Sequence, residues 1–544
     1  MCTLFFFLLA PLQVCVVSQE AKLTPVNGTG STYGFGFSVD VGADRVVVGY
    51  PDQTPPLGGA KGAAYVFDRI GGSWVQQAEL GDSSYTGDGR FGLSVALDGD
   101  VIAVGTPYVY VPTGLGAAHI FRRVNGTWTQ EAVIEPPSIL PPCAAVGRSI
   151  DIAGDTLLIG GTPVINPTPA VHGRALIYGR VAGAWTLQWV SPIHSSDGND
   201  AAFGGSVLLA GDTAFVGSPT AHGNEPFAGG VYVFTRLGGT WSFQQKLTAQ
   251  DGRSGDRFGF SMAGGADTLL IGATYAEGRI WPDTGAVYVF KRQGSTWLED
   301  TKLVPNSHVQ LAETGIGLAQ SGNLYLAGSY AWSSVHLFSS AGSVLEHLLI
   351  RPPYVGVPKD LFSHSLAMSG DLLAVGARWS QNATGMQTGA VYLYRVDASA
   401  LIPNFYCAPK SAPPACVPRL YHLGEPSLSG ALAGHTYRLR ADKVPPKVLG
   451  LLAYGTSGAA NLPFFGGTLC IAPPIARMSL MSANGLAPCS GVFDVDFNAW
   501  IAAGNDPALQ PGQQIWFQYW YRDPAMPPPD QIGLTAGVTA VICQ

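Results

Sequence analysis

The chain alternates short apolar runs with turn residues, and one such pattern occurs seven times along it. Each unit begins with Phe-Gly-x-Ser or a variant of it, and a glycine follows fourteen residues after that start. Successive starts lie 48 to 57 residues apart, which is a spacing typical of propeller blades. The units start at Phe35, Phe91, Val146, Phe203, Phe258, Thr314 and Phe362.

Each unit contains four short segments with period-two alternation, separated by turn residues. In the fifth unit these include the run 267–273, the run 285–290 and a following Gly-x-x-Trp segment. The first turn is two residues long, and such turns need positive φ at particular positions. We therefore expect a type I′-like turn where Gly99 is the second loop residue and a type II′ turn where Gly42 is the first. The sequence predicts an all-β protein with a seven-bladed β-propeller over residues 19–397.

The seventh unit ends at Tyr394 with no Gly-x-Trp segment after it, which would leave the outer edge of that blade exposed. Residues 20–24 resemble the outer-strand ending 245–248 of the fourth unit. We therefore predict that this N-terminal segment completes the last blade and closes the ring.

The composition changes after Tyr394. Residues 398–418 are rich in proline and alanine and indicate a linker region. Strand-like runs follow within a predicted domain at 404–544, for which a small β-sandwich is the expected fold. The aromatic residues between Trp516 and Tyr521 allow two interpretations, a carbohydrate-stacking face or alternating core and surface positions of one strand. The runs cover residues 436–441, 448–454, 491–497, 514–521 and 537–543.

Five of the eight cysteines lie in this last quarter of the chain, which indicates disulfides in an oxidising compartment. Their connectivity stays open, because five cysteines cannot all pair among themselves and Cys143 is a further candidate partner. The five are Cys407, Cys416, Cys470, Cys489 and Cys543.

Residues 2–17 form an apolar run that is too short to span a bilayer and that fits a signal peptide over residues 1–18. No other stretch is expected to cross a membrane, so we predict a secreted or cell-surface protein. The formal net charge is −7 and the basic residues are scattered, which argues against a nucleic-acid partner.

The repeated units resemble FG-GAP repeats, the blades of the integrin α-subunit propeller and of many secreted bacterial proteins. The resemblance rests on segments such as 256–261, 270–273 and 285–290, and it extends over about residues 19–397. Many units of that family carry a calcium loop between the first two strands, and here that connection is a short turn. The family's calcium sites are therefore not expected in this chain, and neither is another metal or a cofactor.

The sequence contains no convincing catalytic constellation, and we expect a non-catalytic protein. His119 and His336 each occupy a strand position that is tyrosine in other units, so packed histidines are expected there. Acidic pairs before the blade starts are interpreted as Asx turns rather than metal ligands. These pairs are Asp82 with Asp88, Asp197 with Asp200, and Asp251 with Asp256.

The loops that join the second and third strands of each unit vary most, and several carry aromatic or histidine side chains. Such loops are common binding surfaces, although each side chain could equally cover only its own loop. We predict that this face recognises an extracellular protein or glycan. Alternatives are an extracellular enzyme acting on glycans and a structural component of a surface layer. The candidate residues are Tyr108, Tyr110, His172, His222, Trp281, Tyr330, Trp332 and Trp379.

Overall fold

The computed structural model describes most of the chain between Val17 and Val541. The ranges are 17–26, 34–53, 62–82, 87–108, 116–137, 145–162, 173–192, 202–277, 283–305, 312–330, 333–339, 345–350, 360–381, 387–396, 419–423, 437–464, 467–485, 490–510, 513–522, 532–535 and 538–541. Within these ranges the chain forms antiparallel strands and one short helix.

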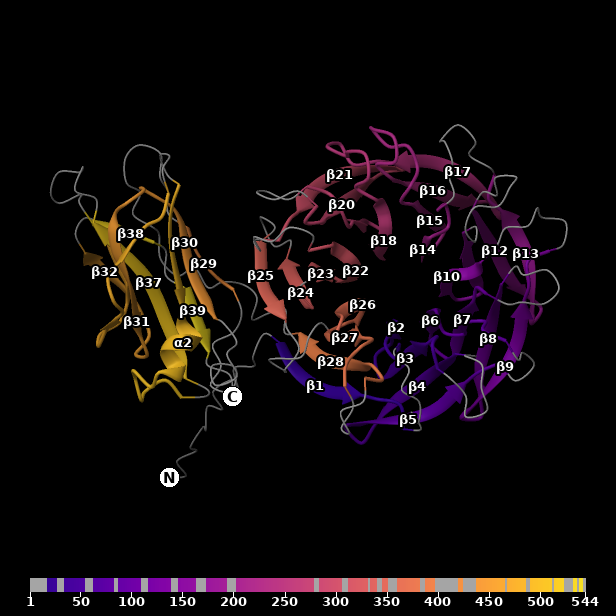
Figure 1. Ribbon diagram of the computed structural model, residues 1–544, viewed down its shortest axis with the longest axis horizontal. Coiled ribbons are helices and arrows are strands. Elements are labelled where there is room, and N and C mark those ends of the chain that lie inside the picture. The colour runs from indigo at the N-terminus through magenta and orange to yellow at the C-terminus, as the bar shows by residue number, and fades with distance from the viewer. Residues whose placement is uncertain are drawn as a thin grey trace, which may run out of the picture.

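Seven four-stranded antiparallel sheets form among the described residues, and Figure 1 shows them arranged in a ring. The first three blades each use four consecutive strands, from the inner to the outer edge. They are β2 (Ser38–Val41), β3 (Arg45–Tyr50), β4 (Ala63–Ile70) and β5 (Ser73–Leu80); β6 (Ser94–Asp98), β7 (Val101–Thr106), β8 (Ala117–Val124) and β9 (Thr127–Ile134); and β10 (Val146–Ala153), β11 (Thr156–Gly161), β12 (Arg174–Val181) and β13 (Ala184–Val190).

Blades 4 to 6 repeat the same order, and blade 7 takes its fourth strand from the N-terminus. This arrangement confirms the all-β propeller fold that the repeats predict. The strands are β14 (Ser206–Ala210), β15 (Thr213–Ser218), β16 (Gly230–Leu237) and β17 (Thr240–Leu247); β18 (Phe258–Gly264), β19 (Thr268–Ala273), β20 (Ala286–Gln293) and β21 (Thr296–Leu303); β22 (Thr314–Ser321), β23 (Leu324–Ser329), β24 (Ser334–Ser339) and β25 (Leu345–Ile350); and β26 (Phe362–Ser369), β27 (Leu372–Ala377), β28 (Ala390–Val396) and β1 (Val17–Leu23).

Strand β1 pairs antiparallel with β28, which confirms the predicted closure of the ring. Its Glu20 carboxylate binds Arg395 of blade 7 at 2.6 Å and Arg69 of blade 1 at 2.8 Å. It also accepts a hydrogen bond from Trp74 Nε1 at 3.0 Å. Glu131, on the outer strand of blade 2, likewise binds Arg122 of its own blade and Arg180 and Trp185 of blade 3. The N-terminal segment therefore supplies both the strand and the polar contact of an ordinary outer edge.

The repeated motif forms the contacts between neighbouring blades. The Phe-Gly-x-Ser serine donates its hydroxyl hydrogen to the carbonyl oxygen of the motif glycine in the next blade, as from Ser38 to Gly92 at 2.9 Å. The same bond occurs at six of the seven blade interfaces, with distances of 2.5 to 2.9 Å. The other donors are Ser94, Ser149, Ser206, Ser261 and Ser365.

The glycine fourteen residues after each start is required by the same contact. A Cβ on Gly376 would lie 2.1 Å from the carbonyl oxygen of Gly36 in the next blade, and one on Gly49 would lie 2.0 Å from that of Gly92. These separations are far below van der Waals contact, so no side chain fits there. The apolar core follows the same plan, because each cluster joins residues of adjacent blades, such as Val47 with Val104.

The first turn of each blade differs from its prediction. Gly99 has a φ of 57° and is the first loop residue after the paired Asp98, and Asp100 has no positive φ. This pattern fits a type II′ turn rather than type I′. Gly42 has no positive φ either, so its predicted type II′ turn is wrong. Type I′-like pairs of positive φ occur instead in outer hairpins, as at Asn125 and Gly126.

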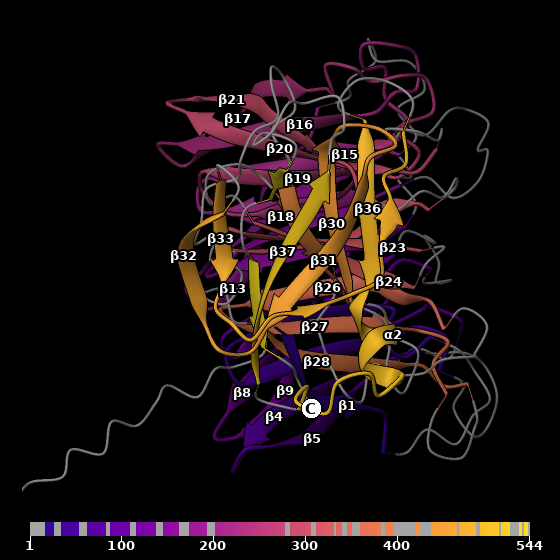
Figure 2. The ribbon, with the colours of Figure 1, turned by 90° about the vertical axis from the view of Figure 1, so that its left-hand side faces the viewer.

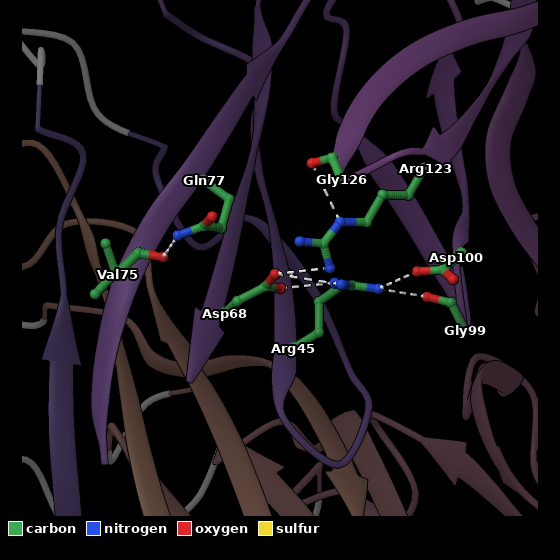
Figure 3. Close-up of polar contacts among 8 residues, drawn as sticks. All are labelled: Arg45, Asp68, Val75, Gln77, Gly99, Asp100, Arg123 and Gly126. Carbon is green, nitrogen blue, oxygen red and sulfur yellow. Dashed lines mark hydrogen bonds and ion pairs between the residues drawn. The ribbon is translucent and has the colours of Figure 1, made fainter. Parts of the chain in front are cut away.

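Ionic contacts reinforce the interface between blades 1 and 2 (Figure 3). Asp68 is bound by Arg45 of its own blade at 2.7 Å and by Arg123 of blade 2 at 3.1 Å. Arg45 also reaches Asp100 of blade 2 at 3.0 Å. Because Asp68 is nearly buried, loss of either arginine would leave part of its charge uncompensated.

The C-terminal part forms two packed sheets with a core of its own (Figure 2). Figure 1 places β29 next to β25 of blade 6. Helix α2 (Phe497–Ala502) is capped by the Asp496 carboxylate. One sheet contains β29 (Arg419–Leu423), β30 (Arg438–Val444) and β36 (Gly491–Asp496); the other contains β31 (Leu449–Gly455), β34 (Ala476–Arg477), β35 (Met481–Ser482), β37 (Gln514–Arg522), β38 (Ile532–Leu534) and β39 (Val538–Val541); and β32 (Ala459–Phe464) pairs with β33 (Gly467–Ile471).

The aromatic residues of β37 alternate between two faces of the strand, as the second of the two interpretations predicted. Phe517, Tyr519 and Tyr521 are buried in the core between the sheets, and Trp516 and Trp520 are half-buried on the opposite face. The sandwich fold expected for this part of the chain is therefore confirmed.

Cys470 is disulfide-bonded, and the other cysteines lie outside the described residues. Its backbone N–H donates to the buried Gln518 side chain at 3.1 Å, which ties β33 to the outer face of β37.

Candidate functional site

The candidate site lies on the face of the ring where the inner strands β2, β6, β10, β14, β18, β22 and β26 begin (Figure 1). Every blade repeats the same strand order, so the connections from second to third strands emerge on this same face. We call it the upper face. The repeat units anchor it, while the side chains that point from it differ from blade to blade.

Three blades carry an aromatic residue at the same place on the upper face, seventeen residues after the start of the unit. These residues are Tyr108, Tyr275 and Trp379. Each backbone N–H donates to the carbonyl oxygen two residues before the unit start, at distances of 3.3, 3.2 and 3.0 Å respectively. The repeat backbone therefore fixes all three aromatic residues in the same way.

An arginine lies over each of these rings. The distance from the guanidinium carbon to the ring centre is 5.5 Å for Arg90 and Tyr108, and 4.4 Å for Arg257 and Tyr275. In blade 7 it is 5.7 Å for Arg378 and Trp379. We call these contacts the three arginine–aromatic pairs. Each combines a fixed positive charge with a flat apolar surface.

The third residue of the Phe-Gly-x-Ser motif forms an inner ring on the same face. In six units its N–H donates to the carbonyl oxygen three residues earlier, which forms a tight turn at the start of the inner strand. The residues at this position have nothing in common except their place. They are Phe37, Leu93, Arg148, Gly205, Phe260, Ile316 and His364.

Blades 7 and 1 bring several of these groups together. The rings of Phe37 and His364 meet edge to face with centres 4.7 Å apart, and the Arg378 guanidinium carbon lies 5.4 Å from the Phe37 ring centre. Nδ1 of His364 and Nε of Arg378 are buried and have no hydrogen-bond partner among the described residues. Burial, together with the charge of Arg378, lowers the pKa of His364 to about 3, so its imidazole is neutral at physiological pH.

Carboxylates of the upper face lie close to the arginines. Asp52 Oδ1 is 4.0 Å from Arg90 Nε, and its charge also interacts with that of Arg378. Burial raises the pKa of Asp52, and the two arginines oppose that effect. Tyr275 donates its hydroxyl hydrogen to Glu313 at 3.3 Å. The upper face therefore presents cationic, acidic and aromatic groups beside one another.

Four of the eight candidate residues lie among the described residues, on four different blades. Tyr108 and Trp379 belong to the arginine–aromatic pairs. His222 packs edge to face on Phe227 with ring centres 5.4 Å apart, and the Tyr330 carbonyl accepts a hydrogen bond from Ser333 N at 3.3 Å. The other four, Tyr110, His172, Trp281 and Trp332, lie outside the described residues.

The sequence prediction missed Tyr275, the three arginines and the inner ring. A signal for the inner ring was available, because the motif position between glycine and serine varies while its neighbours repeat. No comparable signal linked Arg378 to Phe37, which lies in the first repeat unit.

The polar residues considered for metal binding or catalysis make ordinary structural contacts. His119 is buried, and burial lowers the pKa of its imidazole, while His336 is buried in β24. Asp256 accepts a hydrogen bond from Arg253 N at 2.9 Å, and Asp251 binds Lys302 at 2.7 Å. Asp197 and Asp200 lie outside the described residues. Across the described ranges, no group of histidine, cysteine and acidic residues is arranged to hold a metal ion.

A membrane-spanning helix would have to be long and apolar, and none of the helices in the described part of the chain meets that requirement.

Two solved structures are similar to this chain at low scores. Virginiamycin B lyase from Staphylococcus aureus shares 8% identity over 70% of this chain and 100% of that chain, with a TM-score of 0.43. A streptogramin B lyase shares 8% identity over 69% and 96% of the two chains, with a TM-score of 0.42. These scores are too low to support an inference about activity. A comparison with curated proteins gives no match.

The family model for the FG-GAP repeat matches four stretches of the chain, all within or beside the propeller blades. They cover residues 17–67, 74–121, 241–290 and 353–394. The first stretch includes β1 and the last includes β28, the two strands that close the ring. Four stretches of the propeller therefore carry FG-GAP repeats.

Proposed function

We propose that this protein is a secreted or surface-exposed binding protein that recognises an extracellular protein or glycan through the upper face of its propeller. The observation that supports this most is the set of three arginine–aromatic pairs, whose aromatic residues are held at equivalent positions of three blades. The location rests on the apolar N-terminal run and on the cysteine-bearing C-terminal part.

The residue types on this face suit recognition. Tyrosine, tryptophan and arginine are the residues most enriched at binding hot spots, and the two aromatic residues bury a large area at low entropic cost. Trp379 and Phe260 are each 36% exposed, whereas the motif phenylalanines Phe35, Phe91 and Phe258 are buried. The backbone bonds that anchor the pairs would limit the loss of conformational freedom on binding.

The test is a binding screen of the full chain against arrays of glycans and extracellular proteins. A triple variant, Tyr108→Ala, Tyr275→Ala and Trp379→Ala, removes the three rings, and Phe243→Ala removes an aromatic ring that is 50% exposed on an outer strand. Equal melting temperatures would show that all chains are folded.

We expect the triple variant to lose binding by roughly a hundredfold, while Phe243→Ala binds like the parent chain. Undiminished binding by the triple variant would overturn the assignment to the upper face, and failure of the parent chain to bind any array member would overturn the binding function itself.

A further inference from the structure

We propose that a group of side chains between blades 7 and 1 binds the carboxylate of an acidic sugar, such as a uronic acid residue of a glycan. We call this group the Arg378 site, which consists of Phe37, Asp52, His364, Arg378 and Trp379. This inference rests on the proposed function, since it names the ligand class of the same upper face.

Arg378 supplies the anion-binding group. Its guanidinium is permanently charged, and no ion pair with a carboxylate forms for it within the described ranges, although Asp52 is close enough to interact with it. The buried Nε has no hydrogen-bond partner there. Two aromatic rings, Phe37 and Trp379, lie near the guanidinium carbon. A carboxylate that accepts two parallel hydrogen bonds from the guanidinium would satisfy this donor.

His364 adds a second polar group to the Arg378 site. Its Nδ1 is buried without a partner among the described residues, while its ring packs against Phe37. A neutral imidazole nitrogen can donate or accept one hydrogen bond, which suits either a carboxylate oxygen or a sugar hydroxyl.

The charges of the Arg378 site favour a ligand that carries one negative charge and hydroxyl groups. Asp52 is negatively charged when ionised and lies near both Arg90 and Arg378, so a dianion such as phosphate would meet repulsion there. The same carboxylate can accept hydrogen bonds from sugar hydroxyls. The partly exposed indole of Trp379 provides a flat surface on which a sugar ring can stack.

The experiment is calorimetric titration of the full chain with sodium D-glucuronate, D-glucose, sodium acetate, inorganic phosphate and an aspartate-bearing peptide. The variants are Arg378→Gln, Asp52→Asn and Arg477→Gln. The last is a matched control, because the Arg477 guanidinium carbon also lies over an aromatic ring, 5.0 Å from the centre of Trp520, but belongs to the C-terminal sheets and is exposed.

We expect glucuronate to bind more tightly than every other probe. Arg378→Gln should weaken it about tenfold or more by removing the charged bidentate donor. Asp52→Asn should tighten it roughly threefold, since a nearby negative charge is lost. Arg477→Gln should leave glucuronate binding unchanged.

If acetate or phosphate bound as tightly as glucuronate, the assignment to an acidic sugar would be overturned. If the peptide bound more tightly than glucuronate, the ligand would be an acidic protein segment and not a glycan. Equal losses in Arg378→Gln and Arg477→Gln would overturn the Arg378 site. If glucuronate fails to bind while the arrays still bind through the upper face, only this inference fails and the proposed function stands.

Discussion

The interfaces on the two sides of blade 7 are built differently. Toward blade 1, Ser365 donates to the Gly36 carbonyl at 2.9 Å, and Glu20 links the outer strands of both blades. Toward blade 6, Gly317 occupies the place of the donor serine. Ser363 occupies the place of the motif glycine, with a φ of 80°.

This difference shows which parts of the repeat are indispensable. The interface of blades 6 and 7 lacks the serine bond, yet Gly328 still packs against the Ser363 carbonyl, where a Cβ would lie 2.4 Å from the oxygen. The close approach of the inner strands is therefore kept where the hydrogen bond is not. The interface that joins the two ends of the propeller has both, together with the outer polar contact.

Deletion of residues 20–24 should have the largest effect, because it removes most of β1 from the interface of blades 7 and 1. Buried Leu23 and the Glu20 contacts are lost and the edge of β28 is exposed, so we expect a loss of ~5 kcal/mol in unfolding free energy. Thermal unfolding measures it, and an unchanged melting temperature would contradict the closure.

A milder variant isolates the polar part of that interface. Glu20→Gln keeps the strand and should lose about 1–3 kcal/mol, and Glu131→Gln in blade 2 should lose a similar amount because its contacts are alike. A large difference between the two variants would show that the closing interface is not equivalent to the others.

Among these variants, Gly376→Ala should cause the second-largest loss of unfolding free energy, after the deletion. The added Cβ would meet the Gly36 carbonyl, so the inner strands of blades 7 and 1 must separate, at a cost of about 3 kcal/mol. Gly370→Ala is the control, since Gly370 has a φ of 60° but nothing within 4 Å of the added Cβ. It should cost only about 1 kcal/mol. Equal melting temperatures of the two variants would refute the packing argument.

The sequence predicted the fold well because the fold is repeated. Seven copies of one motif, and an N-terminal segment resembling an outer strand, located the blades and the closing strand. The turn types were harder to predict, because placing Gly99 first or second in its loop depends on the strand register.

The candidate site was predictable only in part. Tyr108 and Trp379 stood out as aromatic residues in variable loops. The importance of Arg378 depends on its neighbours Phe37 and His364, which come from different blades, and on the burial of its Nε. The residues next to Arg378 in the sequence predict neither of these properties.

The unfolding free energy should also depend on pH, because two aspartates lie in blades 1 and 3 at a position where blade 7 has an alanine. Asp40 and Asp151 lie five residues after the starts of units 1 and 3, where units 6 and 7 have Ala319 and Ala367. Burial raises the pKa of Asp40 to about 6 and that of Asp151 to about 7, despite hydrogen bonds from backbone N–H groups.

The folded chain therefore binds protons that the unfolded chain has already released above pH 4, so these groups stabilise the fold at low pH and the stabilisation is lost as pH rises through 6 and 7. From pH 5 to pH 8 we expect a loss of roughly 4 kcal/mol, measured by denaturant unfolding. Asp151→Asn should flatten this profile, and an unchanged slope in that variant would exclude Asp151 as its source.

Ser363→Gly should have the smallest effect and the opposite sign. It relieves a positive φ that glycine adopts in the other six units, for a gain of about 0.5–1 kcal/mol, and loses only the 3.3 Å bond from Ser363 Oγ to the Ser329 carbonyl. Ser38→Ala is the contrasting change at a complete interface and should lose about 1 kcal/mol. If Ser363→Gly were destabilising, the serine hydroxyl would outweigh the backbone strain, and the interface of blades 6 and 7 would be an alternative solution to blade packing rather than a weakened copy of the others.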